Sequence, residues 1–413
     1  MQKHKWKRRI GWCMGIFLAG MLGSAPGATI TWVGNVSSNW ADTNNWSPTT
    51  AIPGTNDVAQ FNNSVTNKCV FPTNTTQSVL VVQCTGFAAG GNDRKLVISP
   101  GSALHSTSNV TKRVLDSVAG DRGIIEIQSN AVFTASNGNY YISGSAGAHG
   151  AVDVIGGKFI TGAVLGLGAS SGTGEVHVSS GGYVKCATMY VGIGGNAITD
   201  VGWGVLTISN EASLGEIPTF TIGRYTAGSG TDASGRGTLT IYGGTLSVTT
   251  FKNAEAGAAQ TVNTCYGDVA IRGGQLLVSG TLYNSTADKT VERGTITIAS
   301  GATNIWVGGD YYQRTNCSLI AEITSTSHPS LKVDGVAYLA GTLRVSSNSV
   351  EQRGQWDIII GDANTNLPTP GRIGTFNTFD ASVTAHPANW SLSYTDDKVI
   401  LSYSPRGTIF SAH

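Results

Sequence analysis

The stretch Gly237-Thr-Leu-Thr-Ile-Tyr-Gly-Gly-Thr-Leu-Ser-Val248 contains two runs of alternating polar and apolar residues with a glycine pair between them. Such alternation predicts half-buried β-strands, and adjacent glycines suit a turn in which φ is positive. A glycine followed by an alternating strand occurs seven times, with 24 to 33 residues from one opening to the next. The openings are Gly123-Ile-Ile-Glu-Ile, Gly150-Ala-Val-Asp-Val, Gly174-Glu-Val-His-Val, Gly204-Val-Leu-Thr-Ile, Gly237-Thr-Leu-Thr-Ile, Gly267-Asp-Val-Ala-Ile and Gly294-Thr-Ile-Thr-Ile. A period of this length indicates a solenoid or another repeat array.

A third short strand follows in several repeats, as in Val164-Leu-Gly-Leu-Gly and Phe220-Thr-Ile-Gly. Three short strands with no helical period between them predict one coil of a parallel β-helix, which must stack on neighbouring coils to bury its inward side chains. We therefore expect an all-β fold: a single-stranded, right-handed parallel β-helix with three short strands per coil and a cap at each end. A propeller or an array of β-sandwiches is less favoured, because propeller blades are usually longer and carry four strands each.

Alignment of the repeats separates side chains predicted to face the core from those predicted to face solvent. Two inward columns are apolar throughout, as expected for a buried pleated surface. The first is Ile125, Val152, Val176, Leu206, Leu239, Val269 and Ile296, and the second is Ile127, Val154, Val178, Ile208, Ile241, Ile271 and Ile298. Between them an outward column reads Glu126, Asp153, His177, Thr207, Thr240, Ala270 and Thr297.

Composition narrows the class of protein. Of the 413 residues only 12% are charged, about half of the usual ~25%, while 40% are hydrophobic and 55 are glycine. Disordered chains combine low hydrophobicity with high net charge, so this apolar content and a net charge of +1 indicate a folded chain. The near-neutral charge gives no reason to expect nucleic acid or an anionic membrane surface as a partner.

The N-terminus resembles a secretion signal. A basic segment, residues 3–9, precedes an apolar run, residues 10–22, and small residues follow up to Ala28. This order is typical of a secretory signal peptide, so we expect residues 1–28 to be removed. The apolar run is short for a membrane span of ~20 residues, and we expect no membrane span in the mature chain. The predicted location is extracellular or on the cell surface.

Five cysteines remain outside the signal peptide: Cys69, Cys84, Cys186, Cys265 and Cys317. Their spacing does not fit a zinc site, and no other pattern indicates a metal or a cofactor. Cys69 and Cys84 are close enough in the sequence that they could form a disulfide in an oxidising compartment. The other three are far apart and are expected to be small buried residues.

Residues 29–122 differ from the repeats and open with Trp32, Trp40 and Trp46. Aromatic rings can stack on sugars, so this cluster could be a carbohydrate platform. A solenoid must also close its open end, and terminal repeats are atypical for that reason. Large rings among polar turns favour a lid. We expect residues 29–122 to form an N-terminal cap and the first coils, followed by the regular repeats of residues 123–317.

Residues 318–413 contain longer strands. Ser330-Leu-Lys-Val-Asp-Gly-Val-Ala-Tyr-Leu-Ala-Gly-Thr-Leu-Arg-Val345 is followed by Gly354-Gln-Trp-Asp-Ile-Ile and by Gly374-Thr-Phe376. This order resembles the C-terminal end of bacterial autotransporter passenger domains, and the glycine-opened repeats resemble autotransporter-associated β-strand repeats. The resemblance implies a β-solenoid of a bacterial surface protein whose last coils and cap lie in residues 318–413. Because the segment lacks the series of ~10-residue alternating strands of a membrane barrel, we expect no translocator barrel in this chain.

Parallel β-helices also include polysaccharide lyases and glycoside hydrolases, whose sites combine acids and bases from adjacent coils. Glu126, Asp153 and His177 would lie on neighbouring coils about 4.8 Å apart, and Glu175 would face the same way. Neighbouring charges can shift the pKa of a carboxyl or imidazole toward values useful in acid–base catalysis. These four residues are the catalytic candidates if the chain is an enzyme. The simpler interpretation is a polar sheet face without catalysis.

The favoured function is structural or adhesive and not enzymatic. A long rigid rod would present polar side chains and turn loops to glycans, to the extracellular matrix or to other cells. Loops of variable length, at residues 196–202, 225–236 and 253–265, are where binding is expected to concentrate. A polysaccharide lyase or glycoside hydrolase of β-helix type is the alternative.

Overall fold

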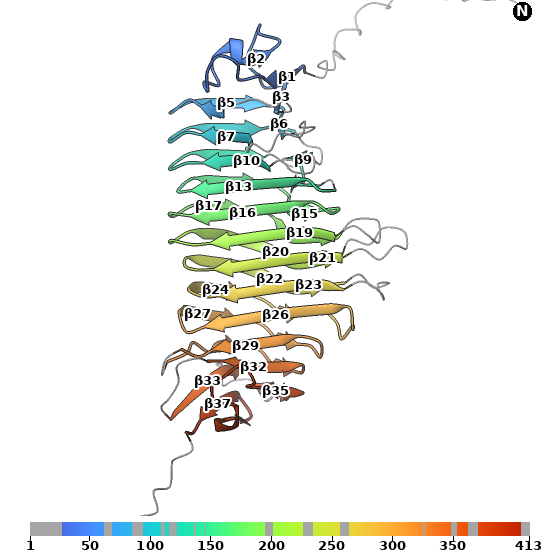
Figure 1. The fold of residues 1–413 in the computed structure, drawn as a ribbon, viewed down its shortest axis with the longest axis vertical. Coiled ribbons are helices and arrows are strands. Elements are labelled where there is room, and N and C mark those ends of the chain that lie inside the picture. Colours follow the sequence, from blue (N-terminus) through green and yellow to red (C-terminus); the bar gives the residue numbers. More distant parts are fainter. Residues whose placement is uncertain are drawn as a thin grey trace, which may run out of the picture.

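Coils stacked along one axis form the molecule: the computed structural model is a parallel β-solenoid of about nine turns (Figure 1). The chain runs from one end of the stack to the other, so each coil packs on the coils before and after it. The structure describes residues 27–61, 68–84, 94–108, 112–114, 122–135, 138–144, 146–194, 201–225, 234–256, 264–324, 327–347, 353–361 and 371–405. The predicted all-β parallel solenoid is confirmed.

One face of the solenoid is a sheet of twelve strands, which we call the first sheet. Its strands are β4 (Cys69–Phe71), β7 (Arg94–Ile98), β10 (Arg122–Ile127), β13 (His149–Ile155), β16 (Thr173–Ser179), β19 (Val201–Ile208), β21 (Ser234–Ile241), β23 (Cys265–Ile271), β26 (Glu292–Ala299), β29 (Ser318–Glu322), β32 (Thr342–Ser346) and β35 (Thr378–Asp380). Neighbouring strands run parallel, one from each coil. The ladder starts before the seven glycine-opened repeats and continues after them.

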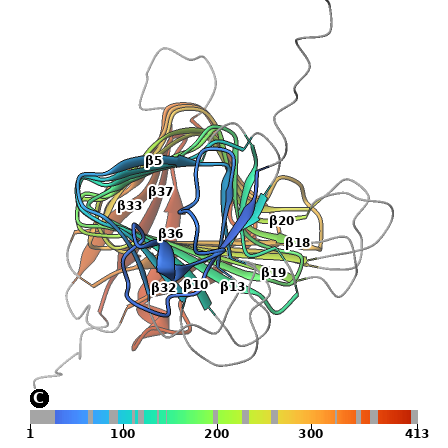
Figure 2. The same ribbon diagram turned by 90° about the horizontal axis from the view of Figure 1, so that it is seen from above.

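The second and third strands of the coils form two further parallel ladders. The long strands β20 (Ser213–Tyr225) and β22 (Thr245–Glu255) belong to both ladders and join them into one 21-stranded second sheet. The view along the axis shows these coils superposed around a common interior (Figure 2). The other strands of this sheet are β5 (Thr76–Val79), β8 (Ala103–Ser106), β9 (Lys112–Val114), β11 (Val132–Ala135), β12 (Tyr140–Ile142), β14 (Lys158–Thr161), β15 (Val164–Ala169), β17 (Tyr183–Lys185), β18 (Thr188–Gly194), β24 (Gly274–Val278), β25 (Leu282–Asn284), β27 (Ala302–Val307), β28 (Tyr311–Gln313), β30 (Leu331–Val333), β31 (Ala337–Leu339), β33 (Gly354–Gly361), β34 (Arg372–Gly374), β36 (Trp390–Tyr394) and β37 (Lys398–Tyr403).

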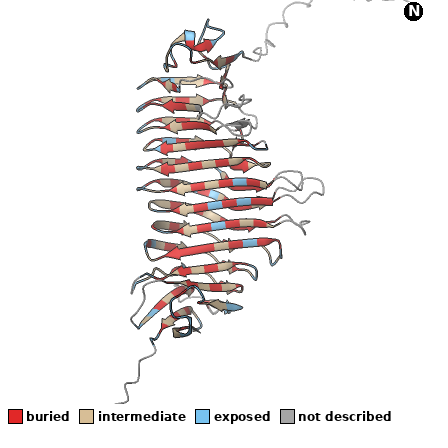
Figure 3. Cartoon of the chain, viewed as in Figure 1, coloured by how far each residue is buried: buried red, intermediate tan, exposed pale blue. Residues whose placement is uncertain are grey.

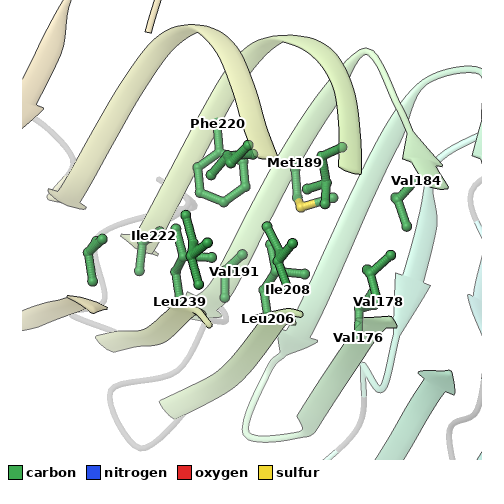
Figure 4. Packing of buried hydrophobic residues seen from close by; sticks show 14 of the residues in the cluster. Val176, Val178, Val184, Met189, Val191, Leu206, Ile208, Phe220, Ile222 and Leu239 are labelled. Carbon is green, nitrogen blue, oxygen red and sulfur yellow. The ribbon is translucent and has the colours of Figure 1, made fainter. Parts of the chain in front are cut away.

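Both inward columns predicted from the repeats form continuous ladders in the first sheet. Every member is at most 2% exposed, and buried residues alternate with less buried ones along the strands (Figure 3). Inside the solenoid, Leu206 and Leu239 of the first sheet lie across the core from Met189 and Phe220 of the second sheet (Figure 4). Full burial of one such side chain stabilises the fold by about 1.5–3 kcal/mol, so stacking the coils supplies the core that one coil cannot make.

The opening glycine of a coil has a steric cause. The chain turns a corner with positive φ within or just after the third strand, at Ser143, Gly168, Gly192, Gly223, Ala254 and Ser285 in successive coils. This corner lies against the first strand of a later coil. A Cβ on Gly204 would lie 2.1 Å from the backbone nitrogen of Gly192, and a Cβ on Gly237 would lie 2.1 Å from the carbonyl oxygen of Val191. The repeat therefore begins with the one residue that leaves this space empty.

Buried amide side chains join three later coils at the same corner. Asn253, Asn284 and Gln313 are in register, and each is at most 2% exposed. Asn253 Nδ2 donates to Asn284 Oδ1 at 2.9 Å, and Asn284 Nδ2 donates to Gln313 Oε1 at 2.8 Å. The same two nitrogens also donate to the carbonyl oxygens of Thr295 and Ser318. These bonds supply partners that buried polar groups need.

Three tryptophans fill the N-terminal end of the solenoid. Trp32, Trp40 and Trp46 are at most 1% exposed, and both other rings contact the Trp46 ring edge to face, with centroids 5.1 and 4.8 Å away. The surrounding elements are β1 (Thr29–Trp32), η1 (Thr43–Asn45), β2 (Trp46–Ser47), β3 (Val58–Phe61) and β6 (Val81–Cys84). Buried rings cannot stack on a sugar, so this geometry supports the lid and not the carbohydrate platform.

The C-terminal end closes with antiparallel strands. β37 pairs with β33 and with β36 in antiparallel fashion, whereas β33 also pairs in parallel with β30. The short helix η2 (Pro387–Asn389) leads into β36. Trp390 packs against Trp356 and Tyr403, with ring centroids 5.5 and 4.9 Å apart. The hairpin covers the edge of β33, where an unprotected edge could pair with another chain.

Burial also accounts for the cysteines that the structure describes. Those buried are Cys69, Cys186, Cys265 and Cys317. Burial raises the pKa of Cys186 to about 12, so this thiol stays protonated. The side chain of Cys84 lies outside the described residues, as do residues 1–26, so the Cys69–Cys84 disulfide and the signal peptide stay predictions. In the described part of the chain, no helix is both long enough and apolar enough to cross a membrane.

Candidate functional site

The register of the first sheet brings the predicted outward column together. Glu126 on β10 pairs with Asp153 on β13, and Asp153 pairs with His177 on β16. The three side chains lie between the two buried columns, on the outward side of the sheet. Glu175 lies on the same side, two residues before His177, and contacts it. All four candidates thus form one cluster, while their catalytic role stays a prediction.

Glu175 is held by three basic groups. Arg122 Nη2 and His177 Nε2 lie 2.5 and 3.3 Å from Glu175 Oε2, and His149 Nε2 lies 3.2 Å from Glu175 Oε1. Hydrogen bonds from the two imidazoles, together with the charge of Arg122, outweigh burial and hold the pKa of Glu175 well below its usual range. The carboxylate is ionised and accepts hydrogen bonds from these three groups, so it holds no proton to donate as a general acid.

Glu126 also forms an ion pair and a hydrogen bond with neighbouring side chains. Burial acts to raise its pKa, but an ion pair with Lys95 and a 2.7 Å hydrogen bond from Gln128 bring the pKa below the ordinary value. Lys95 comes from β7, one coil before Glu126. This is the arrangement of a cross-strand ion pair that supports a sheet, and it accounts for Glu126 without any catalytic role.

Asp153 differs from the two glutamates. Burial raises its pKa, against the opposing attraction of His177 and Arg122. Asp153 is therefore the carboxyl of this cluster best suited to hold a proton, and His177 lies next to it in register. The other two carboxylates belong to an ion-pair network on an open sheet face, and this favours the simpler interpretation of the cluster as a polar surface.

Glu175→Gln is expected to lower stability near neutral pH by about 1–2 kcal/mol, a value reduced by partial exposure of the ion pairs. Folding lowers the Glu175 pKa, so the group contributes stability above its ordinary pKa of 4.5. That contribution is lost as the pH falls through the lower folded-state pKa. Thermal unfolding followed from neutral to acidic pH should therefore show a flatter profile for the variant. Glu211→Gln, at an exposed turn, should follow the wild type, and an unchanged profile in Glu175→Gln would contradict the network.

A second outward column precedes the opening glycines and is not among the sites predicted from the sequence. It is Arg122, His149, Thr173, Trp203, Arg236, Tyr266 and Arg293, in continuous register. We call it the pre-glycine column. It contains three arginines, one histidine and two aromatic residues, and it contains no acid. The signal was present in the sequence, as the residue before each opening glycine.

Arginine and aromatic side chains alternate in the last four coils of this column. The guanidinium carbon of Arg236 lies 4.9 Å from the centre of the Trp203 ring and 4.8 Å from that of Tyr266, within cation–π range. Trp203 is 47% exposed, although it is a large apolar residue. Among the described residues, neither Arg236 nor Arg293 forms an ion pair, and both are exposed. Their charge is available to a partner.

Another aromatic column faces outward on the third strands. Tyr283, Tyr312 and Tyr338 stack nearly parallel, with centroids 5.1 and 4.6 Å apart. Each ring face is covered by the next ring, so the inner faces are closed to a sugar. This stack stabilises the contact between coils, as cross-strand aromatic pairs do.

The fold defines the class of protein as a β-solenoid. Comparison with models of known protein families, with curated proteins and with solved structures gives no match for this chain. The expected binding loops lie largely outside the described residues, at 195–200, 226–233 and 257–263. The outward face of the first sheet, with the Glu175 cluster and the pre-glycine column, is therefore the candidate site that geometry supports.

Proposed function

We propose that the chain is a secreted or cell-surface β-solenoid with a structural or adhesive role, and that its pre-glycine column binds anionic glycans. The observation that carries this is the outward series Trp203, Arg236, Tyr266 and Arg293, which alternates aromatic and cationic groups without a carboxylate. Trp203 and both arginines are exposed, and Tyr266 is half-buried. Guanidinium groups bind carboxylates in bidentate fashion, and aromatic faces can pack on sugar rings.

Coil spacing supports a polymeric ligand. Neighbouring strands lie about 4.8 Å apart, so a glycan lying along the axis would meet a new side chain of the column at each coil. Single contacts of this kind are weak, and several on one chain combine through effective concentration. Placement at a bacterial surface and the autotransporter-like origin belong to the same proposal. They are supported by the glycine-opened repeats, the solenoid and the signal-like N-terminus.

Arg236→Ala should weaken binding of heparin and of polygalacturonate by about tenfold, equivalent to ~1.4 kcal/mol, because it removes a charge and two cation–π contacts. Arg236→Ala combined with Arg293→Ala should weaken it further, and added salt should do the same. Lys185→Ala removes an exposed charge from the second sheet and should leave binding unchanged. Calorimetry measures the affinity of each variant for the two polyanions. The proposal would be overturned if Lys185→Ala lost as much affinity as Arg236→Ala, or if neutral dextran bound as tightly as the polyanions.

Absence of catalysis is proposed as well, supported by the ion pairs that occupy Glu126 and Glu175. The alternative is a polysaccharide lyase or glycoside hydrolase using Asp153 and His177. Release of unsaturated or reducing products from a panel of uronate polymers, lost in His177→Ala and retained in Arg236→Ala, would replace the adhesive function with the enzymatic one.

A further inference from the structure

The outward side of the second sheet is hollowed across four coils, from β20 to β27. The hollow has a volume of about 390 Å³ and is lined in part by Glu216, Ser247, Leu277, Ser279 and Trp306. This volume lies in the range of small-molecule sites. The hollow is on a different sheet from the pre-glycine column, so a ligand bound in it is independent of the anionic-glycan function.

A β-bulge forms one wall of the hollow. The pairing of β20 with β22 shifts register between Leu214 and Ile217, so that β20 has one more residue than β22 at this point. Bulges redirect side chains and occur often beside functional sites. Glu216, inside the bulge, is exposed, and its Oε1 accepts a 3.3 Å hydrogen bond from the Thr249 hydroxyl. The carboxylate is thereby placed at the rim of the hollow.

Apolar surface forms the opposite wall. Leu277 and Trp306 are adjacent in register on β24 and β27, and both face outward between inward residues. Trp306 Nε1 donates to Asp334 Oδ2 at 2.9 Å, which fixes the orientation of the indole. A large ring held in this way on an outward sheet surface costs little conformational entropy when a ligand packs on it.

The geometry points to a saccharide site, and we propose that the hollow binds a neutral disaccharide unit. A pyranose has an apolar face that suits Trp306 and Leu277, and hydroxyl groups that can donate to the Glu216 carboxylate and bond to Ser247 and Ser279. The Glu216 charge disfavours uronic acids and sulfated sugars. Glu216 lies two coil steps from Leu277 and three from Trp306, about 10 and 14 Å along the axis, a span that matches a disaccharide. This ligand has the opposite charge preference to that proposed for the pre-glycine column.

Trp306→Ala should weaken binding of neutral disaccharides at least tenfold. The probes are cellobiose, maltose, lactose and mannobiose, titrated into the full chain and followed by calorimetry and by saturation-transfer NMR, with digalacturonate as the charged comparison. Tyr242→Ala removes a 60% exposed ring elsewhere on the surface and should leave binding unchanged. Wild-type protein should bind at least one neutral probe and bind digalacturonate more weakly. Binding of none of the four at millimolar concentration would overturn the proposal.

Glu216→Gln serves as a second variant, because the residue is exposed and the change keeps its shape. It should weaken neutral probes several-fold and reduce discrimination against digalacturonate, with an unfolding temperature equal to that of the wild type. Retained discrimination would contradict the role of the carboxylate. An apolar dye that binds the wild type, is lost in Trp306→Ala and is not displaced by any sugar would assign the hollow to an apolar ligand instead. Arg236→Ala should bind neutral probes normally, so the two glycan proposals can fail separately.

Discussion

Gly237→Ala is expected to lower the free energy of unfolding by about 3 kcal/mol or more. The added Cβ would lie 2.1 Å from the carbonyl oxygen of Val191 and 2.7 Å from the backbone nitrogen of Gly223. Both neighbours are backbone atoms of stacked corners, so relief requires coils to move apart, and overpacking of this kind costs about 1–3 kcal/mol or occasionally more. Chemical denaturation followed by circular dichroism measures the loss. Hydrogen exchange should locate it in the coils of Val191 and Gly223.

Gly243→Ala is the matched control in the same coil. Its nearest contact to a new Cβ would be ordinary, 3.4 Å from the backbone nitrogen of Asn210, and its φ is not positive. Alanine there should leave stability unchanged or raise it slightly by restricting the unfolded chain. If Gly237→Ala proved as stable as Gly243→Ala, the corner would not be the reason that each repeat opens with glycine.

The inward columns could be predicted because a strand has a period of two. A shift of one residue would turn Ile125 and Ile127 to solvent and Glu126 into the core, so the pattern allows one register. The limits of the solenoid were harder to predict. Leu96 and Leu319 continue the first inward column, but their coils lack the opening glycine. An opening glycine is needed where the first strand packs against the positive-φ corner of an earlier coil. Coils without that contact can have another residue at this position.

The candidate site could be predicted only in part. Alignment placed Glu126, Asp153 and His177 together, since they share one outward position. It did not show that the negative charge of Glu175 is compensated by ion pairs, because those partners, Arg122 and His149, come from other coils. Alternation of apolar residues identifies the buried positions of a strand and says nothing about which side chains occupy the outward ones. The pre-glycine column could therefore be found only by comparing the outward residues of successive repeats.

The hollow on the second sheet could not be predicted from the sequence, and the reason differs from that for the pre-glycine column. Part of its lining lies at a bulge between Leu214 and Ile217, which shifts the register of one strand pair. A shift of this kind depends on the pairing partner and leaves little trace in the alternation of one strand. The amide ladder escapes prediction for a related reason: Asn253 and Asn284 look like turn residues in sequence, whereas stacking buries them.

Asn284→Ala is expected to cost about 3 kcal/mol of stability. The change removes the acceptor of Asn253 Nδ2 and the donor to Gln313 Oε1 and to the Ser318 carbonyl. One N–H of the Asn253 amide then lacks its acceptor, while the bonds from Asn253 Nδ2 to the Thr295 carbonyl and from the Tyr311 hydroxyl to Gln313 Oε1 remain. Loss of a partner inside the core costs about 1–3 kcal/mol, and the small cavity adds to this. Asn316→Ala removes an exposed amide that donates to the Lys289 carbonyl and should change stability by less than about 0.5 kcal/mol. Denaturant unfolding of both variants measures the difference.

A double-mutant cycle separates the ladder from simple loss of volume. If Asn253 and Asn284 act through their shared hydrogen bond, Asn253→Ala combined with Asn284→Ala should cost less than the sum of the two single changes, by about 0.5–3 kcal/mol. The second change then removes a group that the first has already left without its partner. Strict additivity would mean that each amide matters only for the space it fills. A positive coupling would mean that the three coils are joined by hydrogen bonds between buried amide side chains, in addition to their apolar packing.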